Sequence, residues 1–243
     1  MILCELNYYL STKNSVKFIL LNAYYNKKIN IDNKIIIITQ KTLYNNKIKN
    51  ITIVNVFPSL NDKIKNINHL CNLEKLSCCK ISGIDNIKKL TTINKLFCYN
   101  NLKIKNINHL YNLKVLHCAG YSGIDQNGFK YLKKITKLRC EHNIKIKDVN
   151  HLKNIKELYC YSFSGIDQNG IKYLTKISKL LCYDNSKISN VNHLSNLIEL
   201  DCSGCSGLDQ FGIKDLTKIT RLYMNNNNKI KDASHLRNLK YID

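Results

Sequence analysis

One pair of residues, Leu-x-Cys, recurs along most of this 243-residue chain, and its spacing restricts the possible folds more than any other feature. The pair begins at Leu76, Leu96, Leu116, Leu138, Leu158, Leu180 and Leu200, and Leu222 continues the series with Met in place of Cys. The successive steps are 20, 20, 22, 20, 22, 20 and 22 residues, so two kinds of coil alternate in a 42-residue double repeat. Periods of this size are typical of solenoids, in which each unit buries its apolar edge only against its neighbours.

Each kind of coil has its own pattern. Residues 138–152 read Leu-x-Cys-x-x-Asn-x-Lys-Ile-x-x-Val-Asn-His-Leu, and residues 158–174 read Leu-x-Cys-x-x-Phe-Ser-Gly-Ile-Asp-Gln-Asn-Gly-x-Lys-x-Leu. Both resemble the leucine-rich repeat, a strand followed by a return segment with regularly spaced Leu or Ile. The resemblance implies an α/β fold: a leucine-rich-repeat solenoid (horseshoe) with parallel strands on the concave face and short helices or turns on the convex side.

Polar residues also recur in register with the Leu-x-Cys pair. Asn101, Asn143, Asn185 and Asn227 occupy the position of the family's ladder asparagine, where a buried amide satisfies backbone groups left open as the strand turns. The segment from Leu200 to Leu216 resembles the cysteine-containing subclass of leucine-rich repeats. This resemblance implies that Cys205 holds the ladder position, which Ile81, Tyr121 and Phe163 hold in the sister coils. Three aspartates suit helix N-caps, namely Asp125, Asp167 and Asp209.

Residues 1–27 depart from the repeat. Apolar residues at helical spacing predict two short amphipathic helices, broken at residues 11–14. The order Glu5-Leu6, Tyr9-Leu10-Ser11, Val16-Lys17-Phe18, Leu21-Asn22 and Tyr25 resembles an F-box, the helical adaptor that docks Skp1 in ubiquitin ligases, although the opening Leu-Pro-x-Glu is absent. The resemblance implies that a Skp1-like adaptor contacts Leu3, Leu6, Leu10, Val16, Phe18 and Leu21. The alternative is a helical cap that shields the first coil.

The F-box-like start, the cysteine-containing repeats and the excess of Asn, Lys and Ile together resemble the F-box/leucine-rich-repeat proteins of giant DNA viruses of amoebae. Residues 28–55 are transitional: 35–38 and 51–56 have the pattern of strands, and Val56 lies 20 residues before Leu76. We therefore expect degenerate coils there and the regular solenoid over residues 56–243. A last strand is expected near 239–242, with no polar capping coil after it.

The formal charge of +21 arises from 38 Lys and Arg against 17 Asp and Glu. Such an excess fits either an anionic partner, such as nucleic acid, or a solvated lysine-rich surface. The start of the chain lacks a basic region and a cleavage site, and no apolar stretch is long enough to span a bilayer. Together with 11 Cys, these features favour a reducing compartment in which the thiols are free. We therefore expect the protein in the cytoplasm, which could be that of a host cell, or in the nucleus, and we expect no membrane partner.

Cys and His side chains are common metal ligands, and both residue types recur in register along the chain. The expected geometry of the repeat argues against a metal site. Parallel side chains on strands roughly 4.8 Å apart cannot place four thiolates tetrahedrally around zinc. Five histidines recur two coils apart, too far for joint coordination, and are expected to brace the convex turns: His69, His109, His151, His193 and His235. We therefore predict no metal, no cofactor and no catalytic residue.

Strand alternation sends Leu and Cys inward and the residues around them onto the concave face. These outward positions hold six basic and four acidic residues, and they are rich in aromatic residues. Aromatic and Arg side chains are typical of protein-binding hot spots. The predicted partner-binding residues are Phe97, Tyr99, Arg139, Tyr159, Tyr161, Tyr183 and Tyr223.

The favoured function is therefore a protein-protein interaction module, in its most specific form the substrate-recognition subunit of a ubiquitin ligase. One alternative is a stand-alone repeat protein that does not dock Skp1. Another is a basic solenoid that binds nucleic acid through lysines of the return segments, such as Lys103, Lys105, Lys145, Lys147, Lys229 and Lys231.

Overall fold

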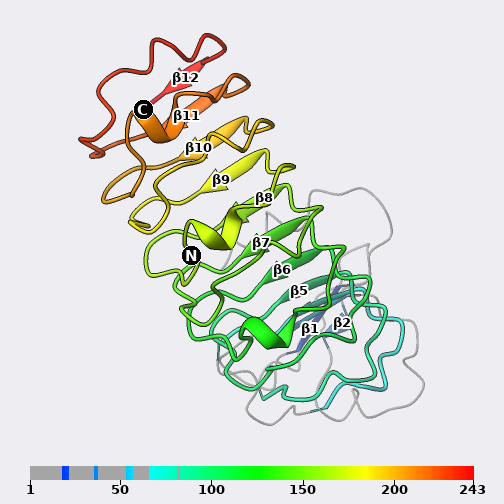
Figure 1. The fold of residues 1–243 in the computed structure, drawn as a ribbon. Coiled ribbons are helices and arrows are strands. Elements are labelled where there is room, and N and C mark those ends of the chain that lie inside the picture. Colours follow the sequence, from blue (N-terminus) through cyan, green and yellow to red (C-terminus); the bar gives the residue numbers. More distant parts are fainter. Residues whose placement is uncertain (1–17, 22–35, 38–52, 57–65, 81–82) are drawn as a thin grey trace.

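The structure, a computed structural model, describes residues 18–21, 36–37, 53–56, 66–80 and 83–243. Its strands form one parallel sheet in which each regular coil adds one short strand (Figure 1). The regular strands, one for each Leu-x-Cys pair or its Met variant, are β4 (Lys75–Ser77), β5 (Lys95–Phe97), β6 (Val115–His117), β7 (Lys137–Arg139), β8 (Glu157–Tyr159), β9 (Lys179–Leu181), β10 (Glu199–Asp201) and β11 (Arg221–Tyr223). Strand β3 (Ile53–Val56) precedes them in the sheet and β12 (Tyr241–Ile242) follows them. The chain is thus a solenoid of about eight regular turns, as the Leu-x-Cys spacing predicts.

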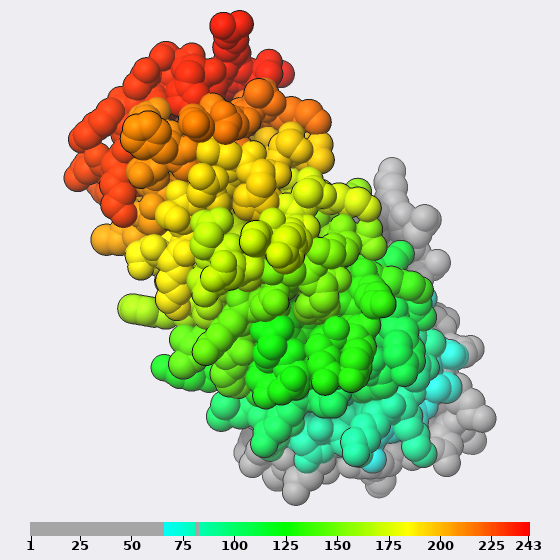
Figure 2. Space-filling model, viewed as in Figure 1, coloured from blue at the N-terminus to red at the C-terminus, as the bar shows by residue number. Residues whose placement is uncertain are grey.

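Figure 2 shows the described coils packed one on another in sequence order, and in the sheet each strand pairs only with the strands beside it. Register follows the repeat: Leu138 pairs with Leu116 on one side and with Leu158 on the other. At the first regular strand the partner of Leu76 is Val54, so the first step is 22 residues and not the 20 expected from Val56.

In the N-terminal region, the prediction of a second amphipathic helix is wrong for residues 18–21. Residues 18–21, expected within the second amphipathic helix, form strand β1 (Phe18–Leu21), which lies between β3 and β2 (Ile36–Ile37) in the sheet. The run Phe-Ile-Leu-Leu explains the difference, since a short continuous apolar segment suits a strand of a parallel sheet as well as a helix. The other positions of the F-box-like segment, including Leu3, Leu6, Leu10 and Val16, lie outside the described residues. The strand-like segments expected near 36–37 and 53–56 are confirmed as β2 and β3.

The core consists of stacked columns of Leu, Ile and Cys that are almost completely buried. Within each strand from β4 to β11 the middle Leu is buried and its two neighbours face outward, as strand alternation requires. The cysteine column behaves as apolar filling. Burial raises the pKa of Cys140 and Cys160, and it raises that of Cys202 to about 12, so these thiols stay protonated.

The asparagine ladder is confirmed. Asn143 is fully buried; its Nδ2 donates to the carbonyls of Cys118 (2.8 Å) and Ile124 (3.1 Å), and its Oδ1 accepts from the N–H of Lys145 (3.1 Å). Asn185 and Asn227 repeat this arrangement, each toward the coil before it. One side chain per double repeat thereby satisfies backbone groups of two successive coils.

In the alternate coils the ladder residue is Ser, which corrects the placement of Cys205 and its equivalents. Ser122, Ser164 and Ser206 are fully buried, whereas Cys205 is exposed. Tyr121 and Phe163 are also exposed, by 79% and 77%. These coils have one more residue between the Cys and the ladder position, so the preceding side chain is displaced into solvent.

Every complete coil turns through a left-handed residue two positions after its Cys. Examples are His142 (φ 57°) in the coils with Asn and Gly204 (φ 66°) in the coils with Ser. A Cβ on Gly204 would meet the carboxylate of Asp184, which would have to move for a larger residue to fit. The turn sends the chain away from the strand toward the opposite side of the coil.

On the far side of the coil the Asp-Gln-Asn-Gly insertion forms a short 3-10 turn: η2 (Gln126–Gly128), η3 (Asn169–Ile171) or η4 (Phe211–Ile213). The expected capping by aspartate is confirmed, because Asp167 Oδ1 accepts from the N–H of Gly170 at 2.9 Å and Asp125 accepts from two N–H groups. Within the described part of the chain, no helix is both long and apolar enough to cross a membrane.

Two further side chains join each coil to the next. Gln168 Oε1 accepts from the N–H groups of Ser189 (3.0 Å) and Asn190 (2.9 Å), and its Nε2 donates to the carbonyl of Asn190. Asn150 acts in the same way toward the following coil, and both contacts recur at equivalent positions. The expected bracing by histidine is confirmed at His109 and His193, whose Nε2 atoms lie 2.9 and 3.1 Å from carbonyls of the preceding coil.

Candidate functional site

The outward-facing residues of strands β4 to β11, with the residue that follows each Cys, form the concave face. The predicted binding residues all lie there, but their side chains are half-buried and not fully exposed. The reason is that strands of a parallel sheet lie roughly 4.8 Å apart, so large side chains at the same position of adjacent strands pack against one another. The contacts between them define the centre of the face.

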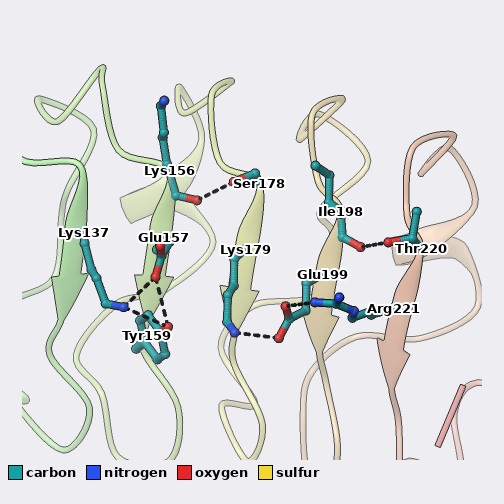
Figure 3. A network of polar contacts seen from close by, with 10 residues as sticks. All are labelled: Lys137, Lys156, Glu157, Tyr159, Ser178, Lys179, Ile198, Glu199, Thr220 and Arg221. Atoms are coloured by element: carbon teal, nitrogen blue, oxygen red, sulfur yellow. Dashed lines mark hydrogen bonds and ion pairs between the residues drawn. The ribbon is translucent and has the colours of Figure 1, made fainter. Parts of the chain in front are cut away.

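Tyr159 on β8 lies at this centre, beside three cationic side chains, of which Figure 3 draws Lys137 and Lys179. The Nζ atoms of Lys137 and Lys179 lie 5.0 and 5.9 Å from its ring centroid, and the guanidinium of Arg139 lies at 5.1 Å. The Tyr159 hydroxyl donates to Glu157 at 3.0 Å. Tyr159 is thus a rigid aromatic platform within a charged frame.

Carboxylates on the neighbouring strands balance these cations. Lys137 pairs with Glu157 at 2.7 Å, and Glu199 on β10 pairs with both Lys179 (2.7 Å) and Arg221 (3.3 Å), as Figure 3 shows. The ion pairs join β7 to β8, and β10 to both β9 and β11. They hold the long side chains in place and leave the centre with little net charge.

A second cluster lies beside the first. Arg139 pairs with the buried Glu141 at 2.6 Å and donates to the hydroxyl of Tyr161 at 3.2 Å. The rings of Tyr161 and Tyr183 stack with their centroids 4.1 Å apart. Burial and the neighbouring Tyr161 raise the pKa of Tyr183, so its hydroxyl is a neutral hydrogen-bonding group at physiological pH.

The aromatic cluster continues from the concave face onto the loops that follow the strands. The ring of His142 lies 6.2 Å from that of Tyr161 and 6.1 Å from that of Phe163. Phe163 is the residue displaced outward in its coil and is 77% exposed. Four rings therefore form a row, from the half-buried Tyr183 to the exposed Phe163.

The remaining predicted residues lie apart from this centre. Phe97 contacts His117 edge to face, with centroids 4.5 Å apart, and Tyr223 lies 5.2 Å from Tyr241. Burial, together with Arg139 and Lys137, lowers the pKa of His117 to about 3, so its ring is neutral at physiological pH.

The structure thus brings together four of the seven predicted residues: Arg139, Tyr159, Tyr161 and Tyr183. Sequence reasoning did not select His142 or Phe163. The exposure of Phe163 could have been predicted from the extra residue that its coil has before Ser164. Phe163 itself was assigned to the buried ladder position from the sequence, so its exposure was not expected. No group of three or more potential metal ligands occurs within the part of the chain that the structure describes.

A family model described as "Leucine Rich repeats (2 copies)" matches residues 195–238. Among solved structures, the chain is similar to an internalin (inlF) from Listeria monocytogenes, with a TM-score of 0.60 and 22% identity over 79% of this chain and 61% of that chain. The fold is a leucine-rich-repeat solenoid. A search of curated protein sequences finds no match.

The functional domain of InlJ from Listeria monocytogenes, described as including a cysteine ladder, has a TM-score of 0.50 and 19% identity over 82% of this chain and 49% of that one. This chain thus covers less than two thirds of either structure's length. At these identities the likeness concerns the fold alone. Leucine-rich-repeat proteins are typically non-enzymatic modules for protein-protein interaction.

Proposed function

We propose that this leucine-rich-repeat protein binds a protein partner on its concave face, centred on Arg139, Tyr159, Tyr161 and Tyr183. Phe97, Tyr99 and Tyr223 would extend the contact toward the two ends of the face. The row of rings from Tyr183 to Phe163 carries the proposal, since it offers both an ordered platform and an exposed aromatic anchor.

The energetics of protein interfaces support this choice. Binding energy concentrates in a few aromatic and Arg side chains that are held in place before binding, because less conformational entropy is then lost. The Tyr161–Tyr183 stack and the Arg139–Glu141 pair provide such order. The balanced charges of the frame would favour a partner of mixed charge over a polyanion.

Alanine substitutions at the centre test the proposal. We expect Tyr161→Ala/Tyr183→Ala to weaken binding of a partner captured by the wild-type chain by roughly 2–4 kcal/mol, as loss of two hot-spot residues does. The measurement is quantitative affinity purification from the native cell, followed by titration of the purified partner.

The matched control removes two tyrosines from another side of the solenoid, Tyr131→Ala/Tyr173→Ala. Both double variants should unfold at similar denaturant concentrations, since all four side chains lie outside the core. Equal loss of the partner in the two variants, or loss only in the control, would contradict a concave binding site.

A narrower proposal is that residues 1–27 dock a Skp1-like adaptor as an F-box does, with residues 18–21 in strand β1 and not in a helix. The chain would then be a substrate-recognition subunit in the cytoplasm or nucleus. This proposal rests on the order of apolar residues in that segment and on the resemblance to giant-virus proteins. We expect a Skp1-like adaptor to co-purify with the full chain but not with the Leu6→Asp/Leu10→Asp variant. Failure of the wild-type chain to retain any such adaptor would rule this role out and leave the concave site untouched.

A further inference from the structure

Most of the positive charge lies away from the concave face. We call the later part of each return segment, which leads from the far side of the coil to the next strand, its closing segment. The closing segments are 68–74, 88–94, 108–114, 130–136, 150–156, 172–178, 192–198, 214–220 and 234–240. Together they contain 14 Lys or Arg but only two acidic residues, Glu74 and Asp215. A chain with a net charge of +21 therefore carries more than half of that charge on this one side.

Hydrogen bonds fix these segments in register, so their side chains form columns. The N–H of Thr136 donates to the carbonyl of Lys114, and the N–H of Lys156 donates to that of Thr136, both at 2.8 Å. The N–H of Tyr173 donates to Asn150 Oδ1, also at 2.8 Å. Lysines of successive coils are thus neighbours on one surface.

The centre of this surface combines lysines with exposed tyrosines. Segments 130–136, 150–156 and 172–178 contain seven Lys and no acidic residue. We call six of their residues the Lys–Tyr face: Lys130, Tyr131, Lys133, Lys153, Lys172 and Tyr173. All six are exposed.

Each tyrosine of the Lys–Tyr face lies beside lysine ammonium groups. Tyr131 is 63% exposed, and the Nζ of Lys130 lies 4.9 Å from its ring centroid. Tyr173 is 58% exposed, and the Nζ atoms of Lys153 and Lys172 each lie 5.3 Å from its centroid. The two tyrosines belong to coils two steps apart, which places them about 10 Å from each other along the stack.

The lysines that follow the ladder residues are less available. The Nζ of Lys187 donates to the carbonyl of Ser164, and that of Lys229 donates to the carbonyl of Ser206, both at 2.9 Å; Lys145 contacts the Ser122 carbonyl in the same way. These ammonium groups satisfy backbone carbonyls beside the Ser ladder. The basic flank expected from the sequence is therefore in part a structural feature. In the Lys–Tyr face, Lys153 makes one such contact, to the carbonyl of Tyr173 at 3.5 Å.

We propose that the Lys–Tyr face is a second binding surface, which takes single-stranded nucleic acid. Lysines along a groove or face neutralise phosphates, and exposed rings stack on bases whatever their sequence. Evenly spaced Lys and Tyr on a rigid stack provide both interactions without a pocket. The bound strand would run along the solenoid axis across coils β6 to β9, independently of the concave face.

The test measures binding of the full chain to a fluorescein-labelled single-stranded RNA of mixed sequence, by anisotropy between about 50 and 200 mM KCl. Lys130→Gln/Lys153→Gln/Lys172→Gln should raise the Kd at least tenfold at the low salt concentration. It should also reduce the slope of log K against log[salt] by about 2, since each phosphate contact on a single strand contributes about 0.7. Tyr131→Ala/Tyr173→Ala should raise the Kd roughly tenfold and leave the slope unchanged.

The matched control removes three exposed lysines elsewhere, Lys103→Gln/Lys105→Gln/Lys147→Gln, and should change the Kd less than threefold. Three results would overturn the proposal: an equal loss of affinity in this control, an unchanged Kd in the tyrosine variant, or no RNA binding by the wild-type chain. Sedimentation with phosphatidylserine vesicles is run in parallel. Binding to the vesicles without binding to RNA would also overturn it, in favour of a membrane surface.

Discussion

Replacing Gly170 with Ala is expected to lower the free energy of unfolding by roughly 3 kcal/mol or more, because the added methyl group has no space. A Cβ at this position would overlap the carbonyl oxygen of Lys147 in the preceding coil. That atom belongs to the backbone and cannot turn away as a flexible side chain would. The coils would have to separate, which would strain the hydrogen bond from the Val149 N–H to the Gly170 carbonyl.

Urea unfolding followed by circular dichroism measures the effect. The control is Asn169→Ala at the neighbouring exposed position, which should change the free energy of unfolding by no more than about 0.5 kcal/mol. A Gly170→Ala variant as stable as the control would mean that the coils are not packed as closely as the structure has them.

The second large effect is expected at the ladder. Asn143→Leu keeps the branched shape of the side chain but leaves the carbonyls of Cys118 and Ile124 and the N–H of Lys145 without their partner. Each unsatisfied buried polar group costs about 1–3 kcal/mol, so we expect a loss of roughly 3–5 kcal/mol in the free energy of unfolding. Loss of the ladder amide affects two coils at once.

The ladder prediction also has a matched control, Asn228→Leu, which changes the same residue type at an exposed position beside the ladder. We expect that variant to unfold within about 0.5 kcal/mol of the wild type. Similar stabilities for the two leucine variants would show that the buried amide contributes no more than a surface one.

The sequence was sufficient to locate the regular strands, because Leu-x-Cys alternation can bury both residues only in a strand at that position. It also identified Asn143 and its equivalents, whose spacing from the strand is constant. The aspartate caps, such as Asp167, followed from their place before an Asn-Gly turn.

Other features depended on contacts that no local pattern encodes. Ser164 and not Phe163 holds the ladder position, since this coil has one more residue between the left-handed Ser162 and the ladder position than the coils with Asn have after His142. The half-burial of Tyr161 and Tyr183 arises from stacking between strands that are 22 residues apart in the sequence. Strand β1 lies out of sequence order in the sheet, which the apolar run at 18–21 could not indicate.

The most direct test of the concave binding site is site-specific photo-crosslinking in the native cell. A benzophenone amino acid replaces Tyr183 on the concave face in one variant and Tyr131 on the Lys–Tyr face in a second variant. We predict one crosslinked protein partner from position 183, absent from position 131 and lost when Tyr161→Ala is added. A protein crosslinked from position 131 and from nothing on the concave face would contradict the proposed site.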